Sequence, residues 1–135
     1  MKPIDSYRVS LLSYTDDVDP LFLREMKQHW LNTTLSANHL QTKYLKLVDY
    51  RYQRQSLTID PVGRTNEYEL IITLEYQFLD DMKQNEATLH RIRTRRFMRF
   101  DREQLTVKNR EENFLVEEMW KELIQRMQGE LLRQI

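Results

Sequence analysis

The stretch NEYELIITLEYQF, residues 66–78, decides the fold because its side chains alternate in character from one position to the next. Every second position carries a large apolar or aromatic side chain: Tyr68, Leu70, Ile72, Leu74, Tyr76 and Phe78. The positions between them are mostly acidic or polar: Glu67, Glu69, Ile71, Thr73, Glu75 and Gln77. Successive side chains of a strand point to opposite faces of its sheet, so the pattern predicts a strand with one buried face and one solvated face.

The segment 87–100 is also typical of a strand, but it carries the opposite charge. One of its faces holds arginines and a single phenylalanine: Arg91, Arg93, Arg95, Phe97 and Arg99. The other face is mostly uncharged, with Arg96 as the exception. Residues 80–86 are mostly polar and form the predicted connection, so we expect an antiparallel hairpin with Tyr76 opposite Ile92.

In that register, Glu75 would face Arg93 and Glu69 would face Arg99. Cross-strand pairs of opposite charge contribute about 0.2–1 kcal/mol each, so the arginines would fix the register of the hairpin. Arginine forks also match the geometry of phosphate, which makes the same face a candidate anion-binding surface with Arg91, Arg93 and Arg95 as ligands. The sequence leaves both interpretations open.

The composition limits both the size and the chemistry of the protein. A chain of 135 residues predicts a single domain, residues 1–135, with one modest core. Lysine plus arginine and aspartate plus glutamate both number 21, and this zero net charge argues against a nucleic-acid partner. The absence of cysteine excludes disulfides, cysteine-ligated zinc and a thiol nucleophile. No run is apolar enough to span a bilayer, and the start of the chain lacks the apolar core of a signal peptide.

The rest of the chain predicts two further strands and two helices. The strands cover 7–12 and 43–59, with a bulge near Val48 where the parity of the apolar positions changes. Asp19 and Pro20 predict the start of a helix that ends near Leu35. Residues 60–65 form a turn and 101–108 a loop, after which Asn109 is expected to cap the last helix.

Each helix has an apolar stripe at helical spacing. The stripes consist of Phe22, Leu23, Met26, Trp30 and Leu31 in the first helix, and of Val116, Met119, Trp120, Leu123, Met127 and Leu131 in the last. Both helices should therefore pack on one face of a single sheet. The predicted fold class is α+β, a two-layer sandwich with a roughly four-stranded mixed sheet and the order strand-helix-strand-strand-strand-helix.

Alternating strand directions bring the turn 60–65, the loop 101–108 and the start of the last helix to one end of the domain. That end gathers the basic residues Arg64, Arg102, Lys108 and Arg110. Both these cations and the free amides of a helix N-terminus favour an anion. A right-handed crossover would bring Asp16 and Asp17 to the same end, where they could pair with the cations instead.

Residues typical of catalysis are few. The three histidines, His29, His39 and His90, are far apart and show no metal-ligand spacing. The sequence contains no glycine-rich phosphate loop and no serine in a nucleophile elbow. We therefore expect no enzyme activity, no bound metal and no cofactor.

The stretch from Gly63 to Leu132 resembles the LPS-assembly lipoprotein family, LptE. The matching residues are GRTNEYEL at 63–70, then Arg96 and Phe97. After them come Lys108, Glu111, Glu112 and VEEMW at 116–120, leading to Leu123, Ile124 and Met127. The earlier part of the chain matches through the order of strand and helix. The resemblance covers roughly half the chain by motif and all of it by architecture.

Members of this family are outer-membrane lipoproteins of Gram-negative bacteria. They sit inside a large β-barrel partner, LptD, help it to insert lipopolysaccharide into the outer leaflet, and are not enzymes. The resemblance implies the same partner and ligand here, with Arg64 and Lys108 at the end that meets lipopolysaccharide. It also implies a place on the periplasmic side of the outer membrane. The signal peptide and lipid-modified cysteine are absent, so we expect a mature fragment from which an N-terminal lipid anchor has been removed.

Two alternatives stand beside this interpretation. The first is a protein-interaction module of similar topology, which pairs a sheet edge with a strand of its partner. The second is an RNA-binding sheet, with Arg91, Arg93, Arg95 and Arg99 on phosphates and Phe97 stacked on a base. The zero net charge and the single aromatic residue on that face count against RNA.

Overall fold

A computed structural model describes residues 7–31, 41–59, 61–62, 65–81, 83, 86–99 and 105–134. Its elements are β1 (Tyr7–Tyr14), α1 (Pro20–His29), β2 (Gln41–Ile59), β3 (Thr65–Leu79), β4 (His90–Arg99) and α2 (Leu105–Gln134). The order strand-helix-strand-strand-strand-helix is the predicted one.

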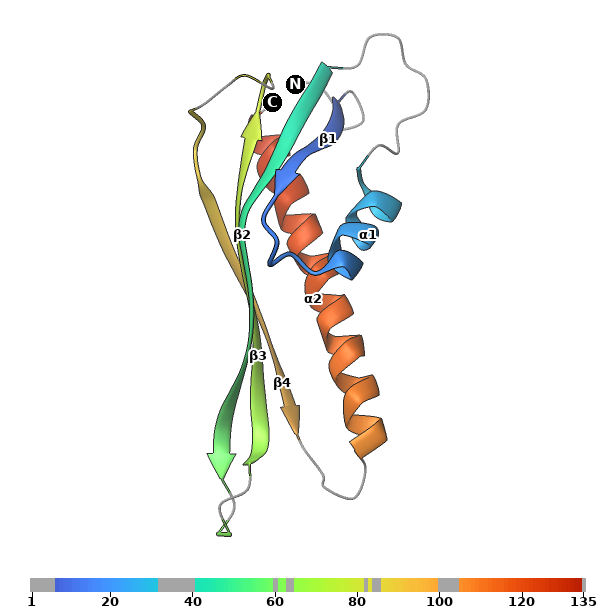
Figure 1. Ribbon diagram of the computed structural model, residues 1–135, viewed down its shortest axis with the longest axis vertical. Coiled ribbons are helices and arrows are strands. Elements are labelled where there is room, and N and C mark those ends of the chain that lie inside the picture. The colour runs from blue at the N-terminus through green and yellow to red at the C-terminus, as the bar shows by residue number, and fades with distance from the viewer. Residues whose placement is uncertain are drawn as a thin grey trace.

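The strands form one mixed sheet in the order β1-β2-β3-β4. β1 runs parallel to β2, and the two following pairs are antiparallel. Both helices lie on the same side of the sheet, with α2 along nearly its whole length and α1 beside its upper half (Figure 1). The predicted α+β sandwich of two layers is confirmed. In the described residues, neither helix has the length and hydropathy that a membrane crossing requires.

The core lies between the sheet and the helices. Three aromatic rings join the two layers at its centre. Phe22 of α1 stacks on Tyr50 of β2 with 5.5 Å between ring centroids, and it lies 6.1 Å from the ring of Trp120 on α2. Trp120 Nε1 donates a hydrogen bond to the Tyr50 hydroxyl at 3.0 Å. Tyr50 and Trp120 are each only 5% exposed, so this hydrogen bond ties α2 to the sheet at a buried site.

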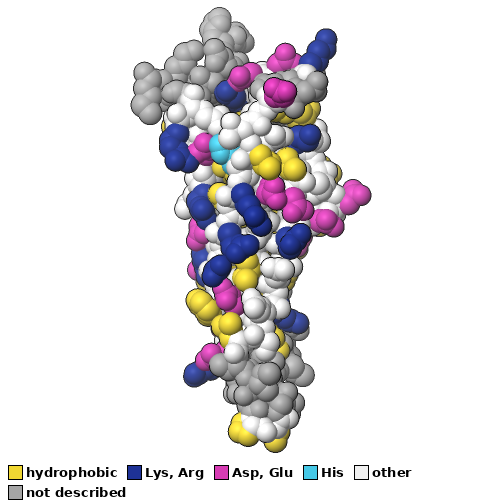
Figure 2. All heavy atoms as spheres, turned by 90° about the vertical axis from the view of Figure 1, so that its left-hand side faces the viewer, with side chains coloured by type: hydrophobic (Ala, Val, Ile, Leu, Met, Phe, Trp, Pro, Cys, Tyr) yellow, Lys and Arg dark blue, Asp and Glu magenta, His cyan; other side chains and the backbone are white. Residues whose placement is uncertain are grey.

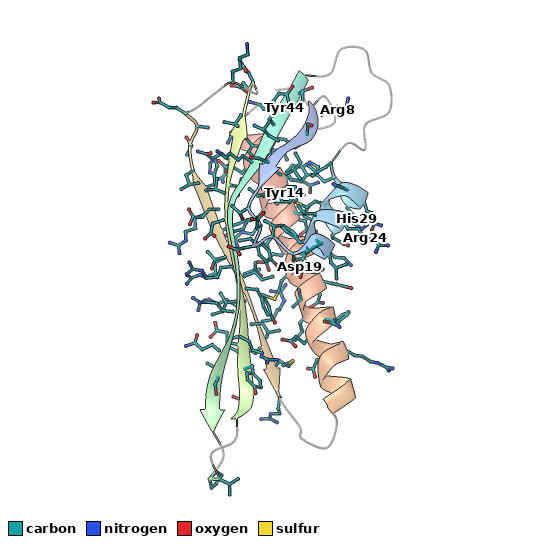
Figure 3. The ribbon with its side chains drawn as sticks, viewed as in Figure 1. Arg8, Tyr14, Asp19, Arg24, His29 and Tyr44 are labelled. Carbon is teal, nitrogen blue, oxygen red and sulfur yellow. The ribbon has the colours of Figure 1, made fainter. Side chains whose placement is uncertain are left out.

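Helix α1 begins where the sequence predicts. Asp19 has an extended backbone, and its Oδ1 accepts a hydrogen bond from the Leu21 N–H at 2.9 Å. Pro20 follows as the first helical residue, and Figure 3 shows Asp19 at this end of the helix. The cap and the proline therefore act together to start α1.

The same helix ends earlier than the predicted residue, Leu35. At Trp30 the backbone leaves the helical conformation, with φ −146° and ψ −59°. Trp30 and Leu31 are both buried, and the Trp30 ring packs edge-on against Phe78 of the sheet at 6.1 Å. The prediction is wrong because the chain turns into the core here, which the apolar spacing alone does not show.

β2 carries the bulge that the sequence predicts. Its register against β3 shifts between Leu47 and Asp49, which leaves Val48 as the extra residue. Because of this shift, Leu47 and Tyr50 can both be buried although their positions differ in parity. The change of parity in the sequence thus has the expected structural cause.

β1 is much shorter than β2. The last β1–β2 pair joins Tyr14 to Leu47, so within the described residues no strand borders β2 on that side from Asp49 onward. At about 3.3 Å per residue, β2 continues for roughly 40 Å beyond β1. Asp16 and Asp17 follow β1 and line hollows beside Tyr50 and Tyr52, in the middle of the sheet. The prediction that these aspartates reach the end of the domain is wrong, because β1 ends opposite Leu47, about a third of the way along β2.

The β3–β4 hairpin forms, but its register differs by two residues from the predicted one. His90, rather than Ile92, lies opposite Tyr76. The observed partners of Glu75 and Glu69 are therefore Arg91 and Phe97, instead of the predicted Arg93 and Arg99. A shift of two residues leaves every side chain on its predicted face, so the alternation could not separate the two registers. The opposition of a glutamate-bearing strand and an arginine-bearing strand is confirmed.

Helix α2 begins at Leu105, earlier than predicted. Asn109 therefore lies inside the helix, and its predicted role as the N-cap is wrong. Residues 105–108 contain neither proline nor glycine, so nothing in their backbone opposes another helical turn. The predicted loop 101–108 is wrong for 105–108, and residues 101–104 lie outside the described part of the chain.

Candidate functional site

The side of the sheet away from the helices carries the predicted arginine face, which consists of Arg91, Arg93, Arg95, Phe97 and Arg99 of β4. All of these residues are exposed, whereas the alternate residues of β4 are buried or half-buried. Figure 2 views the molecule from this side and shows Lys and Arg side chains gathered over its middle, with acidic side chains beside them. The structure thus brings the predicted residues Arg91, Arg93 and Arg95 together on one surface.

Two arginines of this face form ion pairs with glutamates of β3. Arg95 Nη1 lies 3.3 Å from Glu69 Oε1, and Arg99 Nη2 lies 3.5 Å from Glu67 Oε1. Glu69 Oε1 is buried and accepts no hydrogen bond from the described residues. Its contact with Arg95 is therefore an attraction between charges without hydrogen-bond geometry. The Arg99 and Glu67 side chains are 84% and 40% exposed, so water screens this pair and it contributes at most about 1 kcal/mol. The Arg95 side chain is 52% exposed, but that of Glu69 is only 11% exposed, so water screens their pair less. The pairs support the register, yet both guanidinium groups stay accessible to a further anion.

The arginine side chains also cover the outer side of β3. Arg93 Nε donates a hydrogen bond to Thr73 Oγ1 at 3.3 Å. Thr73 and Ile71 are only 5% and 6% exposed, although they face away from the helices. Long basic side chains bury their apolar stems and keep their charged heads in water. The arginine face is therefore charged at its surface and apolar beneath.

Arg96, the exception to the alternation, faces helix α2. Its Nη1 lies 3.2 Å from Glu122 Oε1, and its Nε lies 3.8 Å from Glu118 Oε2. Nη1 also donates to Thr94 Oγ1 at 3.2 Å. Arg96 thus fixes β4 to α2 and takes no part in the arginine face.

The cation cluster predicted at the end of the domain lies mostly outside the described residues. Arg64 and Arg102 are not among them, and neither is the side chain of Lys108, which belongs to the first turns of α2. Arg110 is exposed on α2. The end of β2, the start of β3 and the start of α2 do lie at the same end of the molecule (Figure 1). Anion binding by Arg64, Lys108 and Arg110 stays a prediction.

A hollow of about 490 Å³ opens where β1 ends, between β2, the start of α1 and α2. Its acidic residues are Asp16, Asp17, Asp19 and Glu112. The Tyr52 hydroxyl donates a hydrogen bond to Glu112 Oε1 at 2.7 Å. Burial and this hydrogen bond raise the pKa of Tyr52 well above its ordinary value. Sequence reasoning missed this hollow, because no local spacing signals a contact between residues so far apart in the chain.

The histidines lie apart from one another. His29 is 58% exposed and pairs with Glu25 on α1, on the side of that helix away from the sheet (Figure 3). His39 lies outside the described residues. His90 faces α2, where its Nδ1 lies 3.4 Å from Glu130 Oε1. Across the described ranges, no group of three or more acidic or histidine side chains could hold a metal ion.

These features describe a two-layer α+β fold with one buried core and a charged sheet face, and the described residues bring no catalytic group together. A family model described as "LptE: Lipopolysaccharide-assembly" matches residues 7–131. The chain therefore belongs to the LptE family, whose members act in lipopolysaccharide assembly and are not enzymes.

Solved structures of lipoproteins share the fold. Rare lipoprotein B from Shewanella oneidensis is 26% identical, with a TM-score of 0.66 over 94% of this chain and 95% of that one. An uncharacterized lipoprotein B from Nitrosomonas europaea is 22% identical, with a TM-score of 0.66 over 90% and 79% of the two chains. A minor lipoprotein from Acinetobacter baumannii is 21% identical, with a TM-score of 0.62 over 94% and 91%. A search of curated proteins gives no match.

Proposed function

We propose that this protein is a non-catalytic subunit of the outer-membrane lipopolysaccharide assembly complex. It plugs the lumen of an LptD-type β-barrel and binds lipopolysaccharide during its insertion into the outer leaflet. Membership of the LptE family supports the assembly role. The elongated fold, with α2 along nearly the whole length of the sheet, supports a long insert in a barrel (Figure 1).

The arginine face is the observation that carries the plug role. A domain inside a barrel must present polar groups outward, because the lumen of an outer-membrane barrel is itself polar. The arginine face meets this requirement with exposed guanidinium groups. Arg99 can exchange Glu67, which is 40% exposed, for a carboxylate or carbonyl of the barrel wall at low cost.

Lipopolysaccharide binding follows from the chemistry of the same cations. Guanidinium groups contact two phosphate oxygens at once, and lipopolysaccharide carries phosphorylated sugars. Two groups of residues are the proposed ligands: Arg91, Arg93 and Arg95 on the arginine face, and Arg64, Lys108 and Arg110 at the end where α2 begins. The free amides at the start of α2 favour an anion at that end.

The proposed location is the periplasmic side of the outer membrane. An N-terminal lipid anchor would hold the protein there. The lipoprotein relatives support this placement.

A titration of purified lipopolysaccharide tests the proposed ligands. One variant combines Arg64→Glu, Lys108→Glu and Arg110→Glu, and the other combines Arg91→Gln, Arg93→Gln and Arg95→Gln. The control for the first variant combines Arg24→Glu, Lys27→Glu and Lys121→Glu, and the control for the second combines Arg24→Gln, Lys27→Gln and Lys121→Gln, so each control matches the charge change of its variant at exposed positions of the helices. We expect about tenfold weaker binding for either ligand variant and a smaller change for its control. Equal binding by all the proteins would remove both groups of ligands from the account.

A second candidate function is the docking of a partner strand. The free edge of β2 at residues 49–54 favours it, because no described strand borders this edge beyond the end of β1. An extended segment could add to such an edge through main-chain hydrogen bonds. In the complex with the barrel, the amides of 49–54 should then exchange more slowly with solvent. Unchanged exchange would contradict docking at this edge. The RNA-binding alternative has less support, because Phe97 is the single aromatic residue of the arginine face.

A further inference from the structure

The two edge strands of the sheet differ in how open their main chains are to a further strand. Along β4, arginine side chains occupy backbone carbonyls. Arg126 Nη1 donates a hydrogen bond to the Arg93 carbonyl at 2.7 Å, and Arg96 Nη1 donates one to the Arg95 carbonyl at 2.8 Å. Along β2, no described residue outside β3 forms a hydrogen bond with the main chain of 49–54. A partner strand would therefore find open main-chain groups at β2 and occupied ones at β4.

β2 is also exposed on both of its faces beyond the end of β1. Residues 51–57 are all exposed, whereas residues 70–73, which pair with 51–54 from β3, are all buried. Figure 1 shows that β2 and α2 both continue past the ends of β1 and α1. An added strand would thus continue the row of β1 and cover the part of β2 that the fold leaves open.

The hollow where β1 ends lies beside this open edge and carries negative charge. We call it the acidic hollow, because its lining holds four carboxylates, from Asp16, Asp17, Asp19 and Glu112. No lysine or arginine is among the described residues that line it. Arg54 Nη1 lies 3.4 Å from Glu112 Oε2 and offsets one of the four charges. The acidic hollow therefore keeps an excess of negative charge.

Asp16 and Asp17 are the carboxylates of the acidic hollow that a ligand can use. Both are exposed, and neither forms a hydrogen bond or an ion pair within the part of the chain that the structure describes. Asp19 is occupied by the cap of α1, and Glu112 by Tyr52. A cation in the acidic hollow would thus meet two carboxylates without an existing partner.

Two simpler explanations account for parts of this arrangement. Acidic residues near a helix N-terminus are stabilising, which applies to Asp19 and fades within one turn, so it does not reach Glu112 on α2. Charged side chains on an edge strand also discourage non-specific pairing. Neither explanation gives a reason why an open strand edge lies next to a hollow that lacks basic side chains.

The charge of the acidic hollow also decides between possible partners. If two copies of this chain paired through their β2 edges, their acidic hollows would come close together, and like charges across an interface repel each other. A basic segment instead gains attraction from the same residues. Charge complementarity therefore favours a basic partner over a second copy.

We propose that the β2 edge and the acidic hollow together bind an extended segment of a partner protein with lysine or arginine at alternate positions. Its main chain pairs with residues 49–54, and every second side chain enters the acidic hollow. The aliphatic stem of a lysine or arginine packs on Val18, Val116 and the Tyr52 ring, and its charged head reaches Asp16 and Asp17. This inference rests on the second candidate function, strand docking at β2, and adds the chemistry of the partner.

Amide chemical shifts of the isotopically labelled protein test the proposal with three soluble peptides. Each is about eight residues long, enough to cover 49–54, and alternates threonine with lysine, glutamine or glutamate. We expect the lysine peptide to shift the amides of 49–54 and to bind at least about tenfold more tightly than the glutamine peptide. No shift at 49–54 with the lysine peptide would overturn the proposal. Equal binding of the lysine and glutamine peptides would overturn the preference for a basic partner and would leave strand docking at β2 in place.

Two further measurements separate strand pairing from simple attraction. N-methylation of the amides of the lysine peptide removes its main-chain donors and should weaken binding by at least about tenfold. Unchanged binding would overturn the pairing with β2. Shifts of the same amides that depend on protein concentration, without any peptide, would identify a second copy as the occupant and would also overturn the proposal.

Variants test the acidic hollow itself. Asp16→Asn with Asp17→Asn should weaken binding of the lysine peptide by at least about tenfold and leave binding of the glutamine peptide unchanged. The matched control, Glu86→Gln with Glu117→Gln, removes the same charge at exposed positions elsewhere and should have a much smaller effect. Equal effects of the two double variants would overturn the role of the acidic hollow. These titrations need neither the barrel nor lipopolysaccharide, so they are independent of the proposed plug role.

Discussion

The hydrogen bond between Trp120 and Tyr50 gives a sharp test of the fold. Tyr50→Phe removes the hydroxyl and leaves the ring in place, so the packing with Phe22 survives. Trp120 Nε1 then loses the acceptor that it contacts at 3.0 Å, in a site where the residue is 5% exposed. A buried donor without a partner costs about 1–3 kcal/mol. For a domain of this size, 1 kcal/mol corresponds to roughly 4 °C in melting temperature, so we expect a fall of about 4–12 °C.

Tyr52→Phe is the matched control. The Tyr52 hydroxyl also donates a hydrogen bond to α2, at 2.7 Å to Glu112 Oε1, but Tyr52 is 39% exposed. Water and Arg54 can satisfy Glu112 after the change, so the loss should stay below about 1 kcal/mol. Urea unfolding measures both variants, and an unchanged slope shows that the denatured states are comparable. If Tyr50→Phe were no more destabilising than Tyr52→Phe, the argument from burial would be refuted.

Three further predictions concern the cap, the tyrosines and the link between β4 and α2. Asp19→Ala should cost about 0.5–2 kcal/mol in urea unfolding through loss of the α1 cap, whereas Asp16→Ala should change stability by less than about 0.5 kcal/mol. Burial raises the pKa of Tyr50 and of Tyr76 from 10.0 to about 12, so the folded state favours their neutral forms. This contribution to the free energy of unfolding is fully present below pH 10 and is lost as the pH rises toward 12. The urea midpoint should therefore fall over that pH range. A constant midpoint there would contradict the burial of the two hydroxyl groups. Arg96→Met should lower the free energy of unfolding by about 1 kcal/mol or less, because Glu118 and Glu122 are 43% and 36% exposed and water can hydrate them. A larger loss in urea unfolding would contradict this exposure of the two glutamates.

The sequence predicts the layers of this fold well, because the layers depend on periodic burial. The alternation in 66–78 identifies the buried face of β3, and the change of parity near Val48 identifies the bulge in β2. The cap at Asp19 is equally local. Each of these features depends on residues that are close in the sequence, so a short stretch of sequence is enough to predict it.

Features that depend on distant partners could not be predicted in the same way. The predicted hairpin register differs from the observed one by two residues, because both registers place the same side chains on the same faces. The end of α1 at Trp30 depends on its contact with Phe78 across the core. The length of β1 relative to β2 decides where Asp16 and Asp17 lie, and no local pattern encodes it.

The candidate site likewise has a part that local sequence predicts and a part that depends on distant contacts. Arg91, Arg93 and Arg95 share a face because they alternate along one strand, so the sequence was sufficient to group them. The contact between His90 and Glu130 joins a strand to a distant turn of α2, and neither residue is unusual in its local context.

The most direct test of the central claim is co-purification with the barrel. The lipid-anchored form would be co-expressed with the candidate LptD-type protein and purified in detergent through a tag on this subunit. We predict a stable complex with one copy of each protein. Recovery of this protein alone, from cells whose membranes contain abundant folded barrel, would contradict the assignment as a plug.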